Sequence, residues 1–377
     1  MKVNFIEKIF FVIFAFVVFF PFIPQVIRSS DTQPLLSILF ILYPLFKYFK
    51  TKNLLYFKLN NQTLIYLILI LFLFLVLVFN IFYFNKTPIF SRYFAFIQFL
   101  IAIFFGLFLE IKNKKNWLSY IFLIYLFFTF IYFFTNGFLE ELLIASRDID
   151  AEELLNLGRG ARTLSPEPSF FALHMFNLYV IYKLLNNETD PGIQFINILL
   201  ISVLLLSSLS GYGFLIFIFL FFIEYTKLSL FILLLTILFY PILLNIFYNY
   251  ESLRSIDLII KFITENPFSI FESDASVASR LTSFNFYFKN IKDNFMFGDN
   301  FTIPEGGGLI GVISGIGLIG LILFIIYLLK ICTKFDKIKV ILILFFWSIL
   351  NFISGPFGIP TMGIIIGLVF RNKKVLF

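Results

Sequence analysis

A short polar stretch interrupts a chain that is otherwise dominated by apolar residues. The sequence Arg162-Thr-Leu-Ser-Pro-Glu-Pro-Ser-Phe-Phe-Ala-Leu-His174 holds an arginine, a glutamate, two prolines and the only histidine, and it leads directly into a hydrophobic run. Because proline suits the first turn of a helix, Pro168 predicts that a helix begins at about this residue, with Glu167 immediately before it. A carboxylate at this point is favoured by the helix dipole. It can serve as a general base near a cationic phosphate site, or it can cap the helix and pair with Arg162.

The single histidine is a second candidate for proton transfer. His174 lies seven residues after Glu167, so both share one face of the predicted helix, about two turns apart. That separation is too large for a direct hydrogen bond, so His174 is expected to line a cavity or to relay a proton through water. A buried histidine that bonds to Asn177 or to a carbonyl is an equal alternative. The catalytic candidates are therefore Glu167 and, ranked below it, His174.

The rest of the chain predicts the helices that must position these groups. The chain has 377 residues, of which 60% are hydrophobic and 60 are Phe. Apolar runs of about 17 to 25 residues recur along almost its whole length, as a helix needs to cross a bilayer. We therefore expect an all-α polytopic membrane protein, a single integral membrane domain over 1–377. About twelve spans are predicted, at 9–27, 34–49, 62–84, 89–109, 117–137, 169–185, 193–209, 211–225, 228–247, 308–329, 339–354 and 359–370. The boundaries at 34–49 and within 193–225 are the least defined.

Lysines set the predicted orientation of these spans. Lysine clusters follow the second, fourth and tenth spans and the last span, and the positive-inside rule places them and both termini in the cytoplasm. Two long segments, 138–168 and 248–307, then lie on the outer face. Helix-like patterns occur at 140–158 and 251–265, and the spacing of apolar residues from Leu281 to Phe295 predicts an amphipathic helix.

Arginine is distributed differently from lysine. Seven of the eight arginines fall on the predicted outer face, where topology does not call for positive charge. The planar guanidinium binds phosphate and carboxylate groups through two parallel hydrogen bonds. We expect an anionic ligand for at least two of these arginines. Salt bridges to nearby acids such as Asp148 and Glu152 are the alternative.

Other common chemistries are disfavoured. One histidine and the single Cys332 make a zinc site implausible, and no phosphate-binding loop of the ATPase type is present. No metal and no cofactor is expected. The glycines between Gly306 and Gly320 indicate close helix packing.

Together these motifs resemble the outer-loop signature of bacterial O-antigen and capsular polysaccharide polymerases, the Wzy family. The resemblance covers about 160 to 330. It rests on Arg162 to Ser169, with Glu-Pro-Ser at a helix start, and on Ser208-Leu-Ser-Gly-Tyr-Gly213. Ser276-Val-Ala-Ser-Arg280, followed by Phe297-Gly298 and the glycine-rich tenth span, extends it.

The resemblance implies a metal-independent membrane glycosyltransferase that joins polysaccharide repeat units at the outer face of the bacterial cytoplasmic membrane. The donor is a growing glycan on undecaprenyl diphosphate, and the acceptor is one lipid-linked repeat unit. The resemblance makes Glu167 the candidate base and makes Arg162 and Arg280 the candidate diphosphate ligands. Arg147, Arg159 and Arg254 are weaker candidates. The implied partners are this lipid-linked oligosaccharide and the bilayer, with chain-length regulator and flippase proteins, and no nucleic acid.

Two other functions compete with the polymerase. O-antigen ligases have a similar layout but carry a functional histidine in the large outer loop, where residues 248–307 contain none; His174 keeps this reading open. A flippase or transporter of the same lipid-linked sugars would carry ionisable groups at mid-membrane and repeated halves. Here the spans are nearly free of charge and polar residues collect at one face, which favours surface chemistry.

Overall fold

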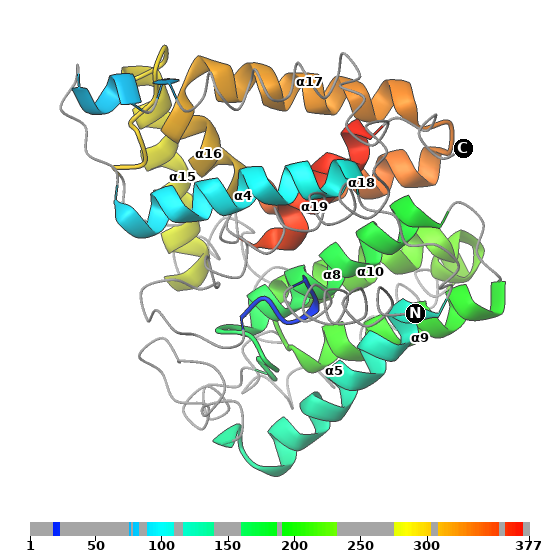
Figure 1. Cartoon of the computed structure of the whole chain (residues 1–377). Helices are drawn as coiled ribbons and strands as arrows, with labels where there is room; N and C mark the ends of the chain where they lie inside the picture. The colour runs from blue at the N-terminus through cyan, green and yellow to red at the C-terminus, as the bar shows by residue number, and fades with distance from the viewer. Residues whose placement is uncertain are drawn as a thin grey trace, which may run out of the picture. The chain divides into compact units, whose positions relative to one another are not determined.

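The computed structural model describes residues 18–22, 75–76, 78–82, 89–108, 116–138, 160–186, 191–231, 275–302, 308–353 and 359–371. Within these residues the chain forms helices and no strand, which confirms the predicted α class. The helices (Figure 1) are α4 (Phe90–Phe108), α5 (Trp117–Phe134), α8 (Pro168–Leu185), α9 (Pro191–Ser207), α10 (Gly211–Glu224), α15 (Ala275–Asp293), α16 (Gly308–Ile316), α17 (Leu318–Lys334), α18 (Ile338–Ile353) and α19 (Pro360–Phe370).

The observed helices agree closely with the apolar runs. The stretch 193–225, which the sequence left open, contains two helices, α9 and α10, with a turn at Ser208 and Leu209. Ser210 ends this turn and accepts a hydrogen bond at its side chain from the Gly213 N–H at 3.0 Å. Serine is a favoured N-cap because its oxygen satisfies one of the free N–H groups at a helix start.

One described helix, α5, is long and apolar enough to cross a membrane by length and composition alone. Five shorter apolar helical stretches, of 10–17 residues, lie in α4, α9, α10, α18 and α19. The count of twelve spans remains a prediction, and most of the first three predicted spans lies outside the described residues.

The chain divides into two compact units. Unit 1 consists of Met1–Ile111, Ser283–Asp336 and Leu344–Phe377, and unit 2 consists of Lys112–Thr282 and Lys337–Ile343. The expectation of a single membrane domain remains a prediction.

Unit 2 is organised around α8. This helix packs against α5, α9 and α10 (Figure 1). From Pro168 to Tyr182 every residue except Phe170 is buried. A helix that is enclosed on nearly all sides must be apolar around its whole circumference. The few polar side chains within it, among them His174 and Asn177, are buried too.

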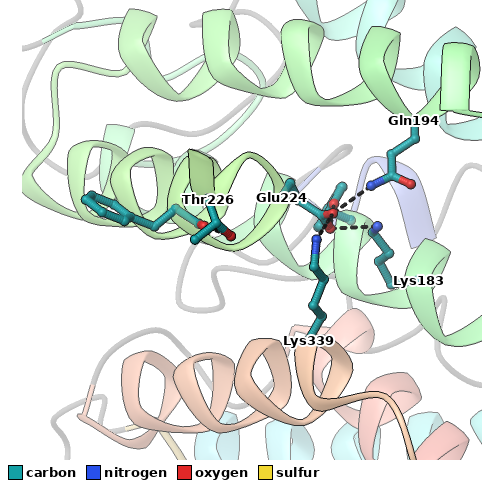
Figure 2. Close-up of polar contacts among 7 residues, drawn as sticks. Lys183, Gln194, Glu224, Thr226 and Lys339 are labelled. Carbon is teal, nitrogen blue, oxygen red and sulfur yellow. Dashed lines mark hydrogen bonds and ion pairs between the residues drawn. The ribbon is translucent and has the colours of Figure 1, made fainter. Parts of the chain in front are cut away.

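A buried ionic cluster joins the Lys183 end of α8 to its neighbours (Figure 2). The Glu224 side chain, at the end of α10, is only 2% exposed and lies 2.6 Å from the Lys183 ammonium group. The Tyr179 hydroxyl donates to Glu224 at 2.7 Å, and the Gln194 amide donates at 2.6 Å. Lys339, near the start of α18, lies 3.9 Å away. A buried carboxylate requires this kind of compensation, because its removal from water is otherwise very costly.

In unit 1 the predicted tenth span is not one helix. It breaks at Gly317, which has a φ of +64°, into α16 and α17. The segment 294–302 lies against the break. The Asn300 N–H donates to the Gly315 carbonyl at 3.1 Å, and the Leu318 N–H donates to the Phe295 carbonyl at 2.6 Å. The glycines therefore permit close packing, as predicted. Their packing partner is the segment 294–302, which lies against the break between α16 and α17.

Asp299 fixes this loop from within. It is 4% exposed, and its carboxylate accepts hydrogen bonds from the Asn290 amide at 2.7 Å and from the Phe301 N–H at 3.1 Å. The Ser314 hydroxyl donates at 3.3 Å. Burial raises the pKa of the Asp299 carboxyl, and these hydrogen bonds oppose the rise. The network ties α15 to the broken helix.

The predicted amphipathic helix is present as α15, although only part of its apolar stripe is packed. Phe284 and Ile291 contact a small buried cluster formed by Tyr287 and Ile310, whereas Phe288 is 62% exposed. Tyr287, which the predicted stripe omitted, is the buried anchor of the helix.

Replacement of Glu224 by Gln is expected to destabilise unit 2. Glutamine keeps the shape but leaves Lys183 without its buried counter-charge, which costs about 3–5 kcal/mol. Thermal unfolding of the purified protein measures this loss. Lys339→Ala is the matched control: this lysine is 54% exposed and more distant, so its loss should cost less than about 1 kcal/mol. Equal melting temperatures for Glu224→Gln and the parent would show that the ion pair of Glu224 with Lys183 does not stabilise the fold.

Candidate functional site

In unit 2 the two residues before Arg162 contact the turn at Ser208, where the Ser208–Gly213 motif begins. The Ala161 N–H donates to the Ser207 carbonyl at 2.9 Å, at the end of α9. A Cβ on Gly160 would collide with the Ser207 carbonyl oxygen and with the Ser208 backbone. The segment 160–167 and the turn at Ser208 are therefore in direct backbone contact, and glycine is required where they touch.

Arg162 lies in this contact region and is fully buried. A guanidinium group stays charged in a protein, and its removal from water requires compensation by an anion or by hydrogen-bond acceptors. The sequence predicted Arg162 as a ligand for an external anion. In this structure it is closed off from solvent, so a diphosphate reaches it only when neighbouring side chains separate.

Glu167 occupies the N-cap position of α8, and Pro168 occupies the first turn, as predicted. The Glu167 carbonyl accepts hydrogen bonds from the Phe170 and Phe171 N–H groups at 3.1 and 3.0 Å. Its carboxylate does not cap the helix; it accepts a hydrogen bond from the Ser169 hydroxyl at 3.2 Å. Glu167 is half-buried. The capping part of the alternative therefore does not describe this side chain, whereas its pairing with Arg162 stays a prediction. The carboxylate stands beside a hydroxyl group at the helix start.

His174 lies inside the unit, about two turns beyond the start of α8. It is 1% exposed, and its ring centroid lies 6.0 Å from that of Tyr125 on α5. This position agrees better with the alternative of a buried structural histidine than with a group that lines an open cavity.

The contribution of α5 to this region was not predicted from the sequence. Three hydroxyl-bearing residues at i, i+4 and i+7, namely Tyr125, Thr129 and Tyr132, are buried on one face of this helix. Thr129 lies 3.0 Å from Thr163, oxygen to oxygen, and Tyr132 packs against Ala161. The regular spacing of hydroxyl groups in an otherwise Phe- and Leu-rich run was the signal that could have revealed this face.

The backbone beside Arg162 is strained. Thr163 has a φ of 26° and Leu164 a φ of 51°, in the left-handed region that side chains with a Cβ rarely adopt. Such residues cost on the order of 1–3 kcal/mol each, and they persist only where surrounding contacts enforce them. Strain of this kind concentrates at functional sites.

The other predicted arginines are not part of the described site. Arg280 lies in the second turn of α15, and its side chain is not among those described. Arg147, Arg159 and Arg254 lie outside the described residues, as do the helices expected at 140–158 and 251–265. Their roles remain predictions.

Within the described part of the chain, no group of three or more His, Cys, Asp or Glu side chains is placed to hold a metal ion. Comparison with family models, with characterised proteins and with solved structures finds no match.

The close backbone contact at Gly160 can be tested by adding a single methyl group at this position. Gly160→Ala is expected to destabilise unit 2 by about 1–3 kcal/mol, because a methyl group must push apart two backbone segments. Gly211→Ala is the matched control, since a Cβ there meets no atom within 4 Å. Thermal unfolding of both variants checks the difference, and equal melting temperatures would show that the segments are not in close contact.

Proposed function

We propose that this protein is a polysaccharide repeat-unit polymerase of the bacterial cytoplasmic membrane. The observation that carries the proposal is the contact of Gly160 and Ala161, immediately before the Arg162–Ser169 motif, with Ser207 and Ser208, where the second motif begins. Both motifs belong to the resemblance with O-antigen and capsule polymerases, although Ser169 and Ser208 lie 39 positions apart in the sequence. Glu167 stands at this same end of α8.

The exposed surface of unit 2 supports a membrane location. α5 contains no charged residue, yet it exposes many large apolar side chains, and so does α9. Soluble proteins rarely expose contiguous apolar surface of this extent, whereas a lipid-facing helix does. The exposed residues on the two helices are Tyr120, Leu123, Ile124, Phe127, Phe130, Phe133, Phe134, Phe195, Ile196, Leu199, Val203 and Leu206.

The proposed orientation assigns different roles to the two ends of α8. Glu167 and Lys183 are separated by roughly 24 Å along the helix, at about 1.5 Å per residue. The Glu167 end faces outward, where lipid-linked repeat units are exposed. The Lys183 end, with its buried bond to Glu224, faces the cytoplasm. About twelve spans with both termini in the cytoplasm complete this arrangement.

The proposed reaction requires one base and one anion site. The Glu167 carboxylate takes the proton from an acceptor sugar hydroxyl, and the freed oxygen attacks the anomeric carbon of the donor glycan. The bond between that carbon and the diphosphate oxygen breaks, and polyprenyl diphosphate leaves with the bonding electrons. Arg162 and Arg280 stabilise the charge that develops on the leaving group.

Deletion of the gene should collapse the surface polysaccharide from a long ladder to a single attached repeat. Glu167→Gln at normal protein levels should reproduce this collapse, because loss of a general base slows a reaction by about 10² to 10⁴-fold. Gel electrophoresis of surface polysaccharide measures both. Long polymer left on its lipid carrier would indicate a ligase instead. Loss of polymer and single repeat alike, with lipid-linked units trapped inside, would indicate a flippase.

Arg280→Lys should lower polymer synthesis by roughly 10- to 100-fold while the protein level stays normal. The lysine ammonium group cannot make the two parallel charge-assisted hydrogen bonds to phosphate that a planar guanidinium group can make. Lys289→Gln is the matched control, because it removes an exposed positive charge from the same helix. Near-normal polymer from Arg280→Lys would argue against a diphosphate role for this residue.

A further inference from the structure

The segment that carries Arg162 is held at points on both sides of that residue. On one side, the Ala161 N–H bonds to the Ser207 carbonyl. On the other side, the Thr163 hydroxyl lies 3.0 Å from that of Thr129, a residue 34 positions earlier in the chain. Further along, the Ser165 hydroxyl donates to the Glu167 carbonyl at 2.9 Å. Arg162 therefore stands between two long-range hydrogen bonds, one to α9 and one to α5.

The direction of the hydrogen bond to α5 follows from a count of protons. Each threonine hydroxyl has one hydrogen to donate. Thr129 donates its hydrogen to the Tyr125 carbonyl at 2.8 Å. Thr163 must therefore donate to Thr129, which accepts this bond from within α5. Both side chains are buried, at 4% and 0% exposed, so water does not compete for this bond.

The Thr163 backbone needs such support. Its positive φ, and that of Leu164, are conformations that the local sequence does not favour. A buried hydrogen bond from the Thr163 side chain to Thr129 supports this conformation. The position of the neighbouring Arg162 backbone then depends on α5.

We infer that Thr129 is a positioning residue for the anion site at Arg162. It acts through Thr163 and does not touch the substrate. This inference rests on the proposed function, because it gives Thr129 a role in binding the lipid diphosphate. It also makes a structural claim that holds whatever the protein binds: α5 immobilises residues 160–167.

The structural claim is tested by hydrogen–deuterium exchange of the purified full-length protein. Thr129→Val keeps the shape but removes the acceptor, so amide exchange in 160–167 should rise roughly 2- to 10-fold, as loss of one neutral hydrogen bond predicts. Thr129→Ser keeps the oxygen and should restore slow exchange. Thr135→Val is the matched control. Thr135 is the C-cap residue of α5, and the hydrogen bond described for its hydroxyl goes to the Ile131 carbonyl of the same helix. Unchanged exchange in Thr129→Val would overturn the inference.

The functional claim is tested by kinetics with lipid-linked repeat units extracted from a strain that lacks the protein. Thr129→Val should raise KM for the lipid-linked substrate roughly 2- to 10-fold with a smaller effect on kcat, and Thr129→Ser should restore KM. Faster exchange with unchanged KM and kcat would reduce Thr129 to a structural residue and overturn the positioning role. If the parent protein itself releases no polyprenyl diphosphate, the proposed function fails and the positioning role fails with it, while the exchange experiment still decides the structural claim.

Discussion

The enclosure of α8 is the constraint on which unit 2 depends. Because almost every side chain from Pro168 to Tyr182 is buried, the helix can be neither shifted nor rotated without loss of packing against α5, α9 and α10. Its two ends carry the charged side chains, Glu167 and Lys183. One end is fixed by the buried ion pair of Lys183 with Glu224. The other end presents Glu167 in a defined position at the helix start.

The same physical logic explains the segment before α8. The segment 160–166 is buried, Arg162 included, so its backbone needs close contacts and hydrogen-bond partners. Unsatisfied polar groups are costly where water is excluded. Gly160 allows contact with the Ser207 carbonyl, and Thr163 reaches across to Thr129. In unit 1, Gly317 and the buried Asp299 play comparable parts, because they let a loop dock into a broken helix.

Much of this arrangement could be predicted from local signals. The helix start at Pro168 follows from proline, and the turn at Ser208 follows from a cluster of small polar residues. Features created by distant contacts could not be predicted. The break at Gly317 depends on bonds from residues 295–300, so the glycine-rich run was interpreted as one helix. The burial of Arg162 and the role of Thr129 depend on which face of α5 points inward, and an apolar run gives little indication of that face.

We propose that Glu167 and Arg162 serve a glycosyl transfer that releases a lipid diphosphate. The most direct measurement uses the purified protein in lipid nanodiscs, supplied only with lipid-linked repeat units. We expect longer glycans together with one polyprenyl diphosphate released for each new linkage, without added nucleotide. Repeat units that remain unjoined and fully attached to their lipid, while the protein is folded and binds them, would contradict it.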